Sequence, residues 1–225
     1  MLNMCMQSSV QYGSENEYRP AIPRLARIGF TVWMIIWTPV ILWAYGPQNF
    51  LWLCNLAQFL ILYSVWTENR LILSSQTGLL LAVGTGWTLD FVIAVIFSGS
   101  ITGFTGYMFD PEIPFTARIA SLYHVFVPVF AVWLCLRIGY DSRGFPLQCV
   151  IGAAALIASW LLTEEYRNVN WVYSPFGIDQ VWAPQAAYVG LLILLYPLIL
   201  YLPGHGLMLV AQSYMQRRHR GSRTC

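Results

Sequence analysis

The sequence predicts an all-helical integral membrane protein, a bundle of six transmembrane helices with both chain termini on the cytoplasmic side. Three observations support this prediction. The chain is 57% hydrophobic but only 10% charged, whereas a soluble domain needs roughly 25% charged residues to cover its surface. The apolar residues are gathered into runs of about 20, the length that crosses a membrane. The basic residues are distributed unequally between the two sets of connections.

Six apolar runs are separated by polar connections. They cover residues 28–45, 49–66, 71–97, 115–136, 145–162 and 184–202. The connections between the first three runs are tight, so those runs should be antiparallel neighbours. A polar cytoplasmic leader, an apolar domain and an Arg-rich cytoplasmic tail follow one another along the chain, over residues 1–27, 28–211 and 212–225.

The basic residues test this map independently. All 12 are arginine. With six spans, ten of them fall on the side of the two termini, and only Arg118 and Arg167 fall on the other. Positive charge is retained on the cytoplasmic side of membrane proteins. The sequence therefore predicts a multi-pass protein of the inner (plasma) membrane whose termini are cytoplasmic.

Several classes of chemistry are disfavoured. Without lysine the chain can form neither a Schiff base nor a phosphate-loop lysine contact. The five cysteines lack metal-site spacing, and Gly84-Thr85-Gly86 lacks the third glycine of a dinucleotide loop. No basic patch with interleaved aromatic residues indicates nucleic-acid binding. We therefore expect no metal and no cofactor, and membrane lipid as the partner.

Two ionisable side chains, Asp90 and His124, lie well inside the predicted spans. An Asp near the membrane centre costs roughly 2.5–3.5 kcal/mol, so such groups usually face the bundle interior and find a partner. Helical rise places Asp90 roughly 10 Å and His124 roughly 13 Å from the outer end of their spans. We therefore expect the two to pair, with Asp90 orienting the imidazole, as a general base or a proton relay requires.

Other polar side chains are expected at the same depth. Cys54 and Asn55 lie roughly 8–9 Å from the outer end of the second span, with Gln58 one turn further. Ser121 lies on the same helix face as the predicted histidine, and Gly86 would let another helix approach the aspartate. Cys54 is a candidate nucleophile or a small apolar filler. Polar side chains in such a layer can also simply tie helices together.

The two longest connections, residues 98–114 and 163–183, lie on the outer side. Long ordered loops on one face often carry function. The second contains the aromatic segment Asn168–Tyr173, from which Asn170 and Trp171 are candidate substrate contacts. The alternative is a pair of solvated acidic loops.

Three segments carry a resemblance to known proteins: Tyr45–Trp52 (YGPQNFLW), Tyr107–Pro114 (YMFDPEIP) and Asn168–Tyr173 (NVNWVY). They resemble those of an uncharacterised group of small bacterial multipass membrane-associated proteins. More distantly, the chain is similar to membrane proteins of the androgen-induced-gene and transmembrane-protein-164 type. Those families are linked to intramembrane lipid-ester hydrolysis and acyl transfer. The resemblance implies that His124 corresponds to their base and Cys54 to their nucleophile.

The function expected from these features is that of an intramembrane hydrolase or acyltransferase acting on a lipid acyl group. His124 would be the general base, Asp90 its orienting partner, Cys54 the nucleophile, and Asn55 or Gln58 the oxyanion donor. The second hypothesis is a proton-coupled carrier with an Asp90–His124 relay, which would need a pH gradient. The third is a structural partner of a membrane complex.

Overall fold

The computed structural model describes residues 21–97 and 102–221. Within these ranges the chain is 81% helical and contains no strand, so the predicted all-α class is confirmed. Eight α-helices follow one another: α1 (Arg24–Tyr45), α2 (Leu53–Thr67), α3 (Arg70–Phe97), α4 (Phe115–Ala120), α5 (Tyr123–Ile138), α6 (Gly144–Leu162), α7 (Gln185–Tyr196) and α8 (Leu202–Gly221).

Five helical segments are long and apolar enough to cross a membrane. They are α1, α3, α4 with α5 (Phe115–Ile138), α6, and α7 with α8 (Gln185–Met215). A five-residue π-helical turn, η6 (Pro197–Tyr201), connects α7 to α8 without interrupting the helix. Helix α2 is also apolar but shorter. The architecture is compatible with a multi-pass membrane bundle.

Helix α2 begins later than the apolar run that predicts it. Residues Pro47–Leu51 form a short 3-10 helix, η1, and Trp52 has an extended ψ of 128°. The Leu53 N–H then donates to the Asn170 side chain at 3.0 Å, so the α-helix starts at Leu53. Its 15 residues rise about 22 Å, which is less than the roughly 30 Å hydrocarbon core of a bilayer.

The fourth apolar run contains a break that its composition does not reveal. Helix α4 ends at Ala120, and α5 begins at Tyr123. Across the break the N–H groups of Leu122 and His124 donate to carbonyl oxygens three residues back, at 3.0 and 3.2 Å. This tighter turn changes the direction of the chain, so α4 and α5 share one span without forming one regular helix.

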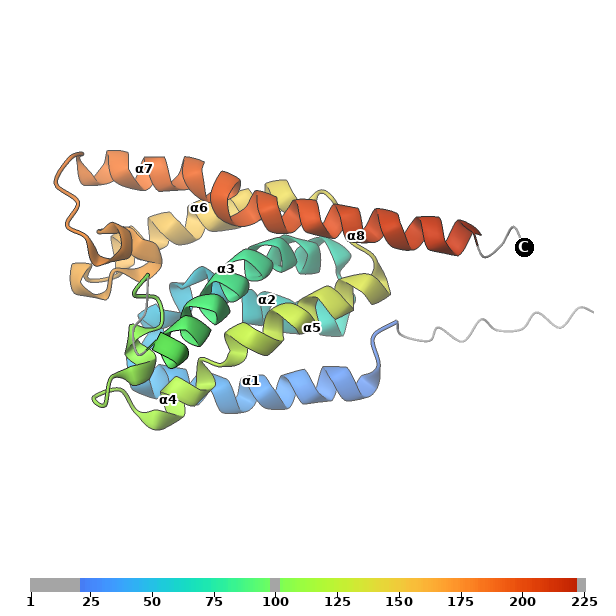
Figure 1. The fold of residues 1–225 in the computed structure, drawn as a ribbon, viewed down its shortest axis with the longest axis horizontal. Coiled ribbons are helices and arrows are strands. Elements are labelled where there is room, and N and C mark those ends of the chain that lie inside the picture. Colours follow the sequence, from blue (N-terminus) through green and yellow to red (C-terminus); the bar gives the residue numbers. More distant parts are fainter. Residues whose placement is uncertain (1–20, 98–101, 222–225) are drawn as a thin grey trace, which may run out of the picture.

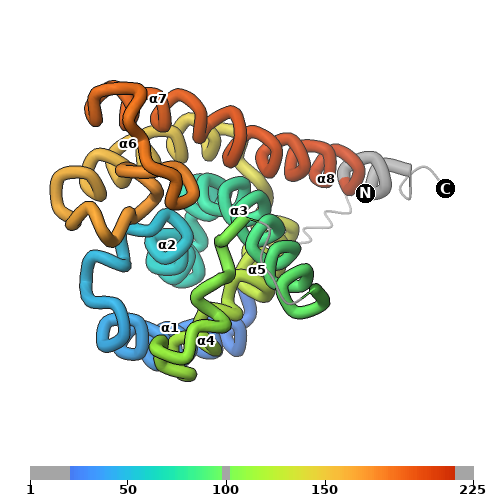
Figure 2. Tube along the Cα trace, turned by 60° about the vertical axis from the view of Figure 1, so that its left-hand side comes forward, coloured from blue at the N-terminus to red at the C-terminus, as the bar shows by residue number. Residues whose placement is uncertain are grey.

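The helices are arranged in three layers (Figures 1 and 2). Helices α2, α3 and α5 form the middle layer, α6, α7 and α8 cover one side, and α1 with α4 covers the other. Helix α3 packs against α2, α5, α6 and α8. Helix α1 begins and α8 ends at the same end of the bundle, and the loops after α3 and α6 lie at the opposite end.

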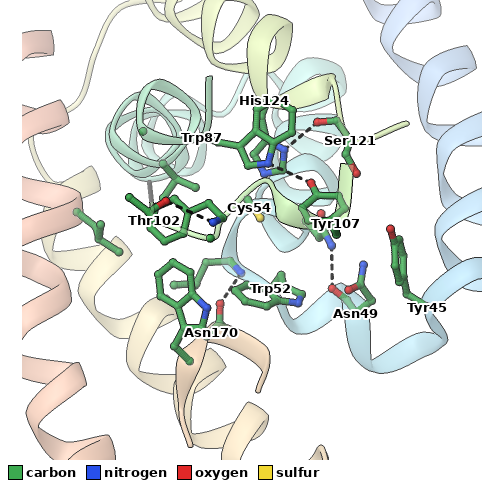
Figure 3. Close-up of a pocket in the computed structure, with 18 of the residues that line it drawn as sticks. Tyr45, Asn49, Trp52, Cys54, Trp87, Thr102, Tyr107, Ser121, His124 and Asn170 are labelled. Atoms are coloured by element: carbon green, nitrogen blue, oxygen red, sulfur yellow. Dashed lines mark hydrogen bonds between the residues drawn. The ribbon is translucent and has the colours of Figure 1, made fainter. Parts of the chain in front are cut away.

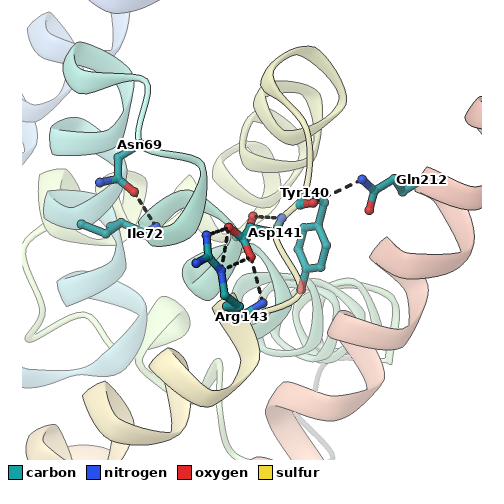
Figure 4. Close-up of polar contacts among 7 residues, drawn as sticks. Asn69, Ile72, Tyr140, Asp141, Arg143 and Gln212 are labelled. Atoms are coloured by element: carbon teal, nitrogen blue, oxygen red, sulfur yellow. Dashed lines mark hydrogen bonds and ion pairs between the residues drawn. The ribbon is translucent and has the colours of Figure 1, made fainter.

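Polar contacts hold the loops at the end where α1 begins (Figure 4). The Arg143 guanidinium donates to the Asp141 carboxylate at 2.7 Å, and this hydrogen bond holds the pKa of Asp141 below its ordinary value. The Asp141 N–H donates to Ser74 Oγ at 2.9 Å. From α8, Gln212 donates to the Tyr140 carbonyl oxygen at 3.2 Å. The α5–α6 turn is thereby fastened to both α3 and α8.

Candidate functional site

A cavity of about 750 Å³ lies among α2, α3, α5 and η6. This volume is within the range of about 300–1,000 Å³ that small-molecule sites occupy. Apolar side chains line its deep part, including Leu79, Val83 and Leu200. Its other end is lined by residues of the two loops that follow α3 and α6. The cavity therefore runs from the loop end of the bundle into its apolar interior (Figure 3).

The first turn of α2 contributes Cys54 and Asn55 to the cavity wall. Because the helix starts at Leu53, Cys54 lies in its first turn. The Asn55 N–H donates to the Trp52 carbonyl oxygen at 2.9 Å, and the Cys54 thiol interacts with the Tyr123 hydroxyl. The thiol is therefore held at the cavity wall beside a phenol hydroxyl.

His124 lines the same cavity from the first turn of α5. Its Nδ1 lies 2.9 Å from the Ser121 carbonyl oxygen. Since a carbonyl oxygen can only accept, Nδ1 carries the proton, and Nε2 retains its lone pair. Nε2 has no hydrogen-bond partner within the described part of the chain. The α4–α5 break thus supplies the carbonyl group that selects the tautomer of His124.

Two aromatic rings fix the orientation of the imidazole. The ring centroids of His124 and Trp87 are 4.8 Å apart with an interplanar angle of 12°. On the other side, the Tyr123 centroid is 4.0 Å away. Figure 3 shows the His124 ring stacked with Trp87 and bonded to Ser121. The imidazole is therefore held rigidly with its unprotonated nitrogen available for a ligand.

The predicted pairing of Asp90 with His124 is wrong. The Asp90 carboxylate accepts hydrogen bonds from the N–H groups of Thr102 and Thr105, at 3.0 and 3.1 Å, and from the Thr105 hydroxyl at 2.7 Å. The loop after α3 folds back over the bundle and brings these donors to the carboxylate. Asp90 therefore anchors the loop, and the orienting role predicted for it falls to the Ser121 carbonyl group.

Gln58 is not among the residues that line the cavity, so the structure does not place it beside Cys54 and His124. Its Oε1 accepts a hydrogen bond from Trp33 Nε1 at 2.8 Å, which ties α1 to α2. Asn55 lines the cavity, but its amide is already engaged. It accepts from the Tyr123 hydroxyl at 2.5 Å and donates to the Asn49 carbonyl oxygen at 2.8 Å. Asn55 therefore holds Tyr123 in position.

Asn170 and Trp171 both contact the cavity, but in different ways. Asn170 is buried, and its side-chain amide donates to the Leu51 carbonyl oxygen at 2.8 Å and to Ser159 Oγ at 2.9 Å. Its Oδ1 accepts the Leu53 N–H. Trp171 stacks on Phe104, with the ring centroids 4.6 Å apart. Asn170 joins the η1–α2 junction to α6, whereas Trp171 forms part of an aromatic wall.

Replacing Asn170 by alanine is expected to destabilise the protein. It leaves two buried groups and one part-buried carbonyl group without this hydrogen-bond partner, and each buried group costs about 1–3 kcal/mol. A clear fall in the thermal unfolding midpoint of the purified protein in detergent would be the measured result. Gln180→Ala in the same loop is the control, because Gln180 makes one hydrogen bond to Ala183. Equal midpoints for the two variants would contradict the joining role of Asn170.

Sequence reasoning missed two tyrosines of the site. Tyr107, from the 3-10 helix η2 (Gly106–Phe109), reaches into the cavity, where its hydroxyl oxygen accepts from Trp87 Nε1 at 3.0 Å. Tyr123 contacts both the Cys54 thiol and the His124 ring. An aromatic residue in an apolar helix or loop looks like packing, so only its hydroxyl contacts reveal the role. Tyr107 does lie in one of the segments that carry the family resemblance.

The cavity thus brings together a thiol, an imidazole with a free nitrogen and two phenol hydroxyl groups, over an apolar interior. No protein-family model, curated protein or solved structure matches the chain. Within the described residues, no group of three or more His, Cys, Asp or Glu side chains could hold a metal ion.

Proposed function

We propose that this chain is a multi-pass protein of the cell inner (plasma) membrane that crosses it six times. In this topology α2, extended by η1, is the second crossing, and both termini are cytoplasmic. The support is the distribution of arginine, since among the described arginines only Arg118 and Arg167 lie at the loop end of the bundle. Many large apolar side chains, such as those of Ile35, Val95 and Leu194, are also exposed along the helices. Such a surface is suited to contact with lipid.

The cavity, in this proposal, is the active site of a lipid acyl hydrolase or acyltransferase. The observation that carries it is that Cys54 and His124 line one apolar cavity, with His124 Nε2 unprotonated and without a partner among the described residues. A nucleophile beside a base whose ring is oriented by a third group is the usual arrangement for covalent catalysis. An acyl chain fits the apolar depth formed by Leu79, Val83 and Leu200.

The proposed reaction proceeds by two transfers. His124 Nε2 takes the proton of the Cys54 thiol, and the thiolate attacks the ester carbonyl carbon. The tetrahedral intermediate collapses by breaking the carbon–oxygen ester bond, and the departing alcohol oxygen receives the proton from the imidazolium. Water then cleaves the thioester in a hydrolase, or an acceptor alcohol or amine does so in an acyltransferase, with His124 again acting as the base.

The oxyanion of the intermediate needs a hydrogen-bond donor. Tyr107 suits this role better than Gln58, because its hydroxyl lies in the cavity. The hydroxyl oxygen accepts from Trp87, and the hydroxyl hydrogen, which interacts with the Ser121 side chain, would turn to the oxyanion. The stacked rings of Trp87 and Tyr123 keep water from the imidazole and hold its angle.

The acyl-enzyme is the species that tests this mechanism. The protein is incubated with a diacyl phospholipid in detergent, without any gradient, and free fatty acid and the mass of the Cys54 peptide are measured. We expect fatty acid release and an added acyl mass on that peptide, both lost in Cys54→Ser. Cys149→Ser, which changes a cysteine outside the cavity lining, should retain both. Release that Cys54→Ser leaves unchanged would rule out the proposed nucleophile.

The hypothesis of a proton-coupled carrier depended on a relay between Asp90 and His124. It is less well supported, because the Asp90 carboxylate binds Thr102 and Thr105. The detergent assay also separates the two functions, since a carrier produces no fatty acid there. A structural partner of a membrane complex would likewise release none.

A further inference from the structure

Two arginines lie beside the outer end of α1, at the loop end of the bundle. Arg167, from the 3-10 helix η3 (Glu165–Arg167), lines the cavity. Its Nη1 donates to the Tyr45 carbonyl oxygen at 2.7 Å. The positive charge of Arg118, from α4, acts on the hydroxyl group of the same Tyr45. All the basic side chains at this end of the described bundle therefore gather around one residue of the cavity wall.

Arg167 keeps hydrogen-bond donors for a ligand. Its Nε donates to the Glu164 carboxylate at 2.7 Å, and Nη1 donates to Tyr45. A guanidinium has five N–H donors, so three are not used by these contacts. The Glu164 side chain is 51% exposed, and solvent weakens its neutralising effect on Arg167.

Arg118 has even fewer partners. Its Nη1 donates to the Met108 carbonyl oxygen at 3.3 Å, and its Nε is buried without a partner. Within the described residues no ion pair of Arg118 occurs. Arg118 is part-buried and its Nε is shielded from solvent, so a charge-assisted hydrogen bond from an anionic ligand would satisfy this group.

The neighbouring Tyr45 also has an unused polar group. Its Oη is buried without a partner among the described residues, and a phenol hydroxyl can donate to an anion. Gly46, with φ of +78°, leaves space beside Arg167, since a Cβ there would lie 3.9 Å from Arg167 Nη1. We call Tyr45, Arg118 and Arg167 the arginine rim. Such unpartnered buried groups are uncommon in proteins.

We propose that the arginine rim binds the anionic group of the substrate, a phosphate or a carboxylate. This inference rests on the proposed function for the place of the acyl chain, which occupies the apolar depth of the cavity. Arginine binds phosphate and carboxylate with paired, charge-assisted hydrogen bonds. Tyr45 lies just before the short η1 in the chain, and Cys54 follows it closely, so an amphipathic lipid could meet both the rim and the thiol. The substrate class is thus an anionic-headed acyl lipid.

Binding is measured apart from turnover by using the Cys54→Ser protein in detergent and detecting bound lipid by native mass spectrometry. The probes are phosphatidylglycerol, diacylglycerol with the same acyl chains, palmitate, and inorganic phosphate. We expect Arg167→Gln to weaken phosphatidylglycerol binding about tenfold, the effect of one charge-assisted contact. Diacylglycerol binding should stay unchanged. Arg167→Lys should restore part of the affinity, because the charge remains but the paired geometry does not.

Arg143→Gln is the matched control, since Arg143 is exposed, lies at the opposite end and pairs with Asp141. Arg118→Gln gives a second variant that keeps the Arg167–Tyr45 contact, and we expect it to weaken phosphatidylglycerol binding as well.

The four probes also identify the anion. Palmitate binding stronger than phosphatidylglycerol binding would identify a fatty carboxylate as the anion, and competition by inorganic phosphate would identify a phosphate. Equal loss of phosphatidylglycerol and diacylglycerol, or no loss of either in both rim variants, would overturn the inference. Charge-selective binding can persist even if the fatty-acid assay fails, so the two proposals are separable.

Discussion

Replacing His124 by alanine is expected to abolish acyl-lipid turnover while the protein still inserts and folds. Positioned acid–base catalysis contributes about 10²–10⁴ in rate, and His124 is the only histidine among the described residues that line the cavity with Cys54. Fatty acid release from phospholipid by purified protein in detergent measures the loss. His124→Gln should lose activity similarly, because an amide cannot take a proton at neutral pH.

His205→Ala is the matched control for this experiment. His205 also has a ring nitrogen in a hydrogen bond, with Tyr140 Oη at 2.7 Å, but it lies outside the cavity lining. Lipid turnover by the His205→Ala variant should stay near that of the unmodified protein. If His124→Ala turned over lipid at the same rate as His205→Ala, His124 would not be the base, and the proposed mechanism would be abandoned.

The second large effect is expected from Gly84→Ala in α3. A Cβ at this position would lie 2.4 Å from Pro128 Cγ and 2.8 Å from the His124 carbonyl oxygen. The first atom belongs to a rigid ring and the second to the backbone, so neither can move aside cheaply. Overpacking of this kind costs about 1–3 kcal/mol and occasionally more. We expect a lower thermal unfolding midpoint and a loss of turnover, because α5 must move away and take His124 with it.

Gly86→Ala is a close control, two residues further along the same helix. A Cβ on Gly86 would meet no atom within 4 Å, and alanine favours a helix over glycine by about 1 kcal/mol. This variant should be as stable as the unmodified protein or more so. A midpoint for Gly84→Ala equal to that for Gly86→Ala would show that α3 and α5 are not in close contact there.

These two glycines illustrate what the sequence could and could not predict. Apolar runs predicted the helical elements, since burial in lipid imposes a length and a composition on each span. The sequence also indicated a close helix approach near Asp90, but placed it at Gly86. The close approach is at Gly84, on another side of α3. Which face of a helix meets its neighbour depends on packing with residues remote in sequence, such as Pro128.

The position of a residue along its helix does not determine the direction in which its side chain points. Helical rise placed Cys54, Asn55 and His124 near one level, and these three residues line one cavity. The same arithmetic placed Gln58 and Asp90 near that level, yet Gln58 faces α1 and Asp90 binds the loop after α3. Rise along a helix does not determine rotation about its axis. Loop residues cannot be located this way at all, which is why the contacts of Asp90 were not foreseen.

The sequence could not distinguish the aromatic residues of the site from those that only pack in the bundle. Tyr107 and Tyr123 are both in apolar surroundings, and their sequence context gives no sign that their hydroxyl groups enter the site. The break between α4 and α5 is similarly hidden in a continuous apolar run. It matters because it exposes the Ser121 carbonyl group that holds His124 Nδ1.

The late start of α2 has a consequence for where a lipid would react. In the proposed topology, the 15-residue helix leaves about 8 Å of the roughly 30 Å hydrocarbon thickness uncovered. A short crossing draws the bilayer thinner around itself. The glycerol esters of a phospholipid lie at the boundary between its acyl chains and its headgroup, so local thinning lowers this boundary toward Cys54. Lipid beside α2 would then need little displacement from its leaflet before its ester reached the thiol.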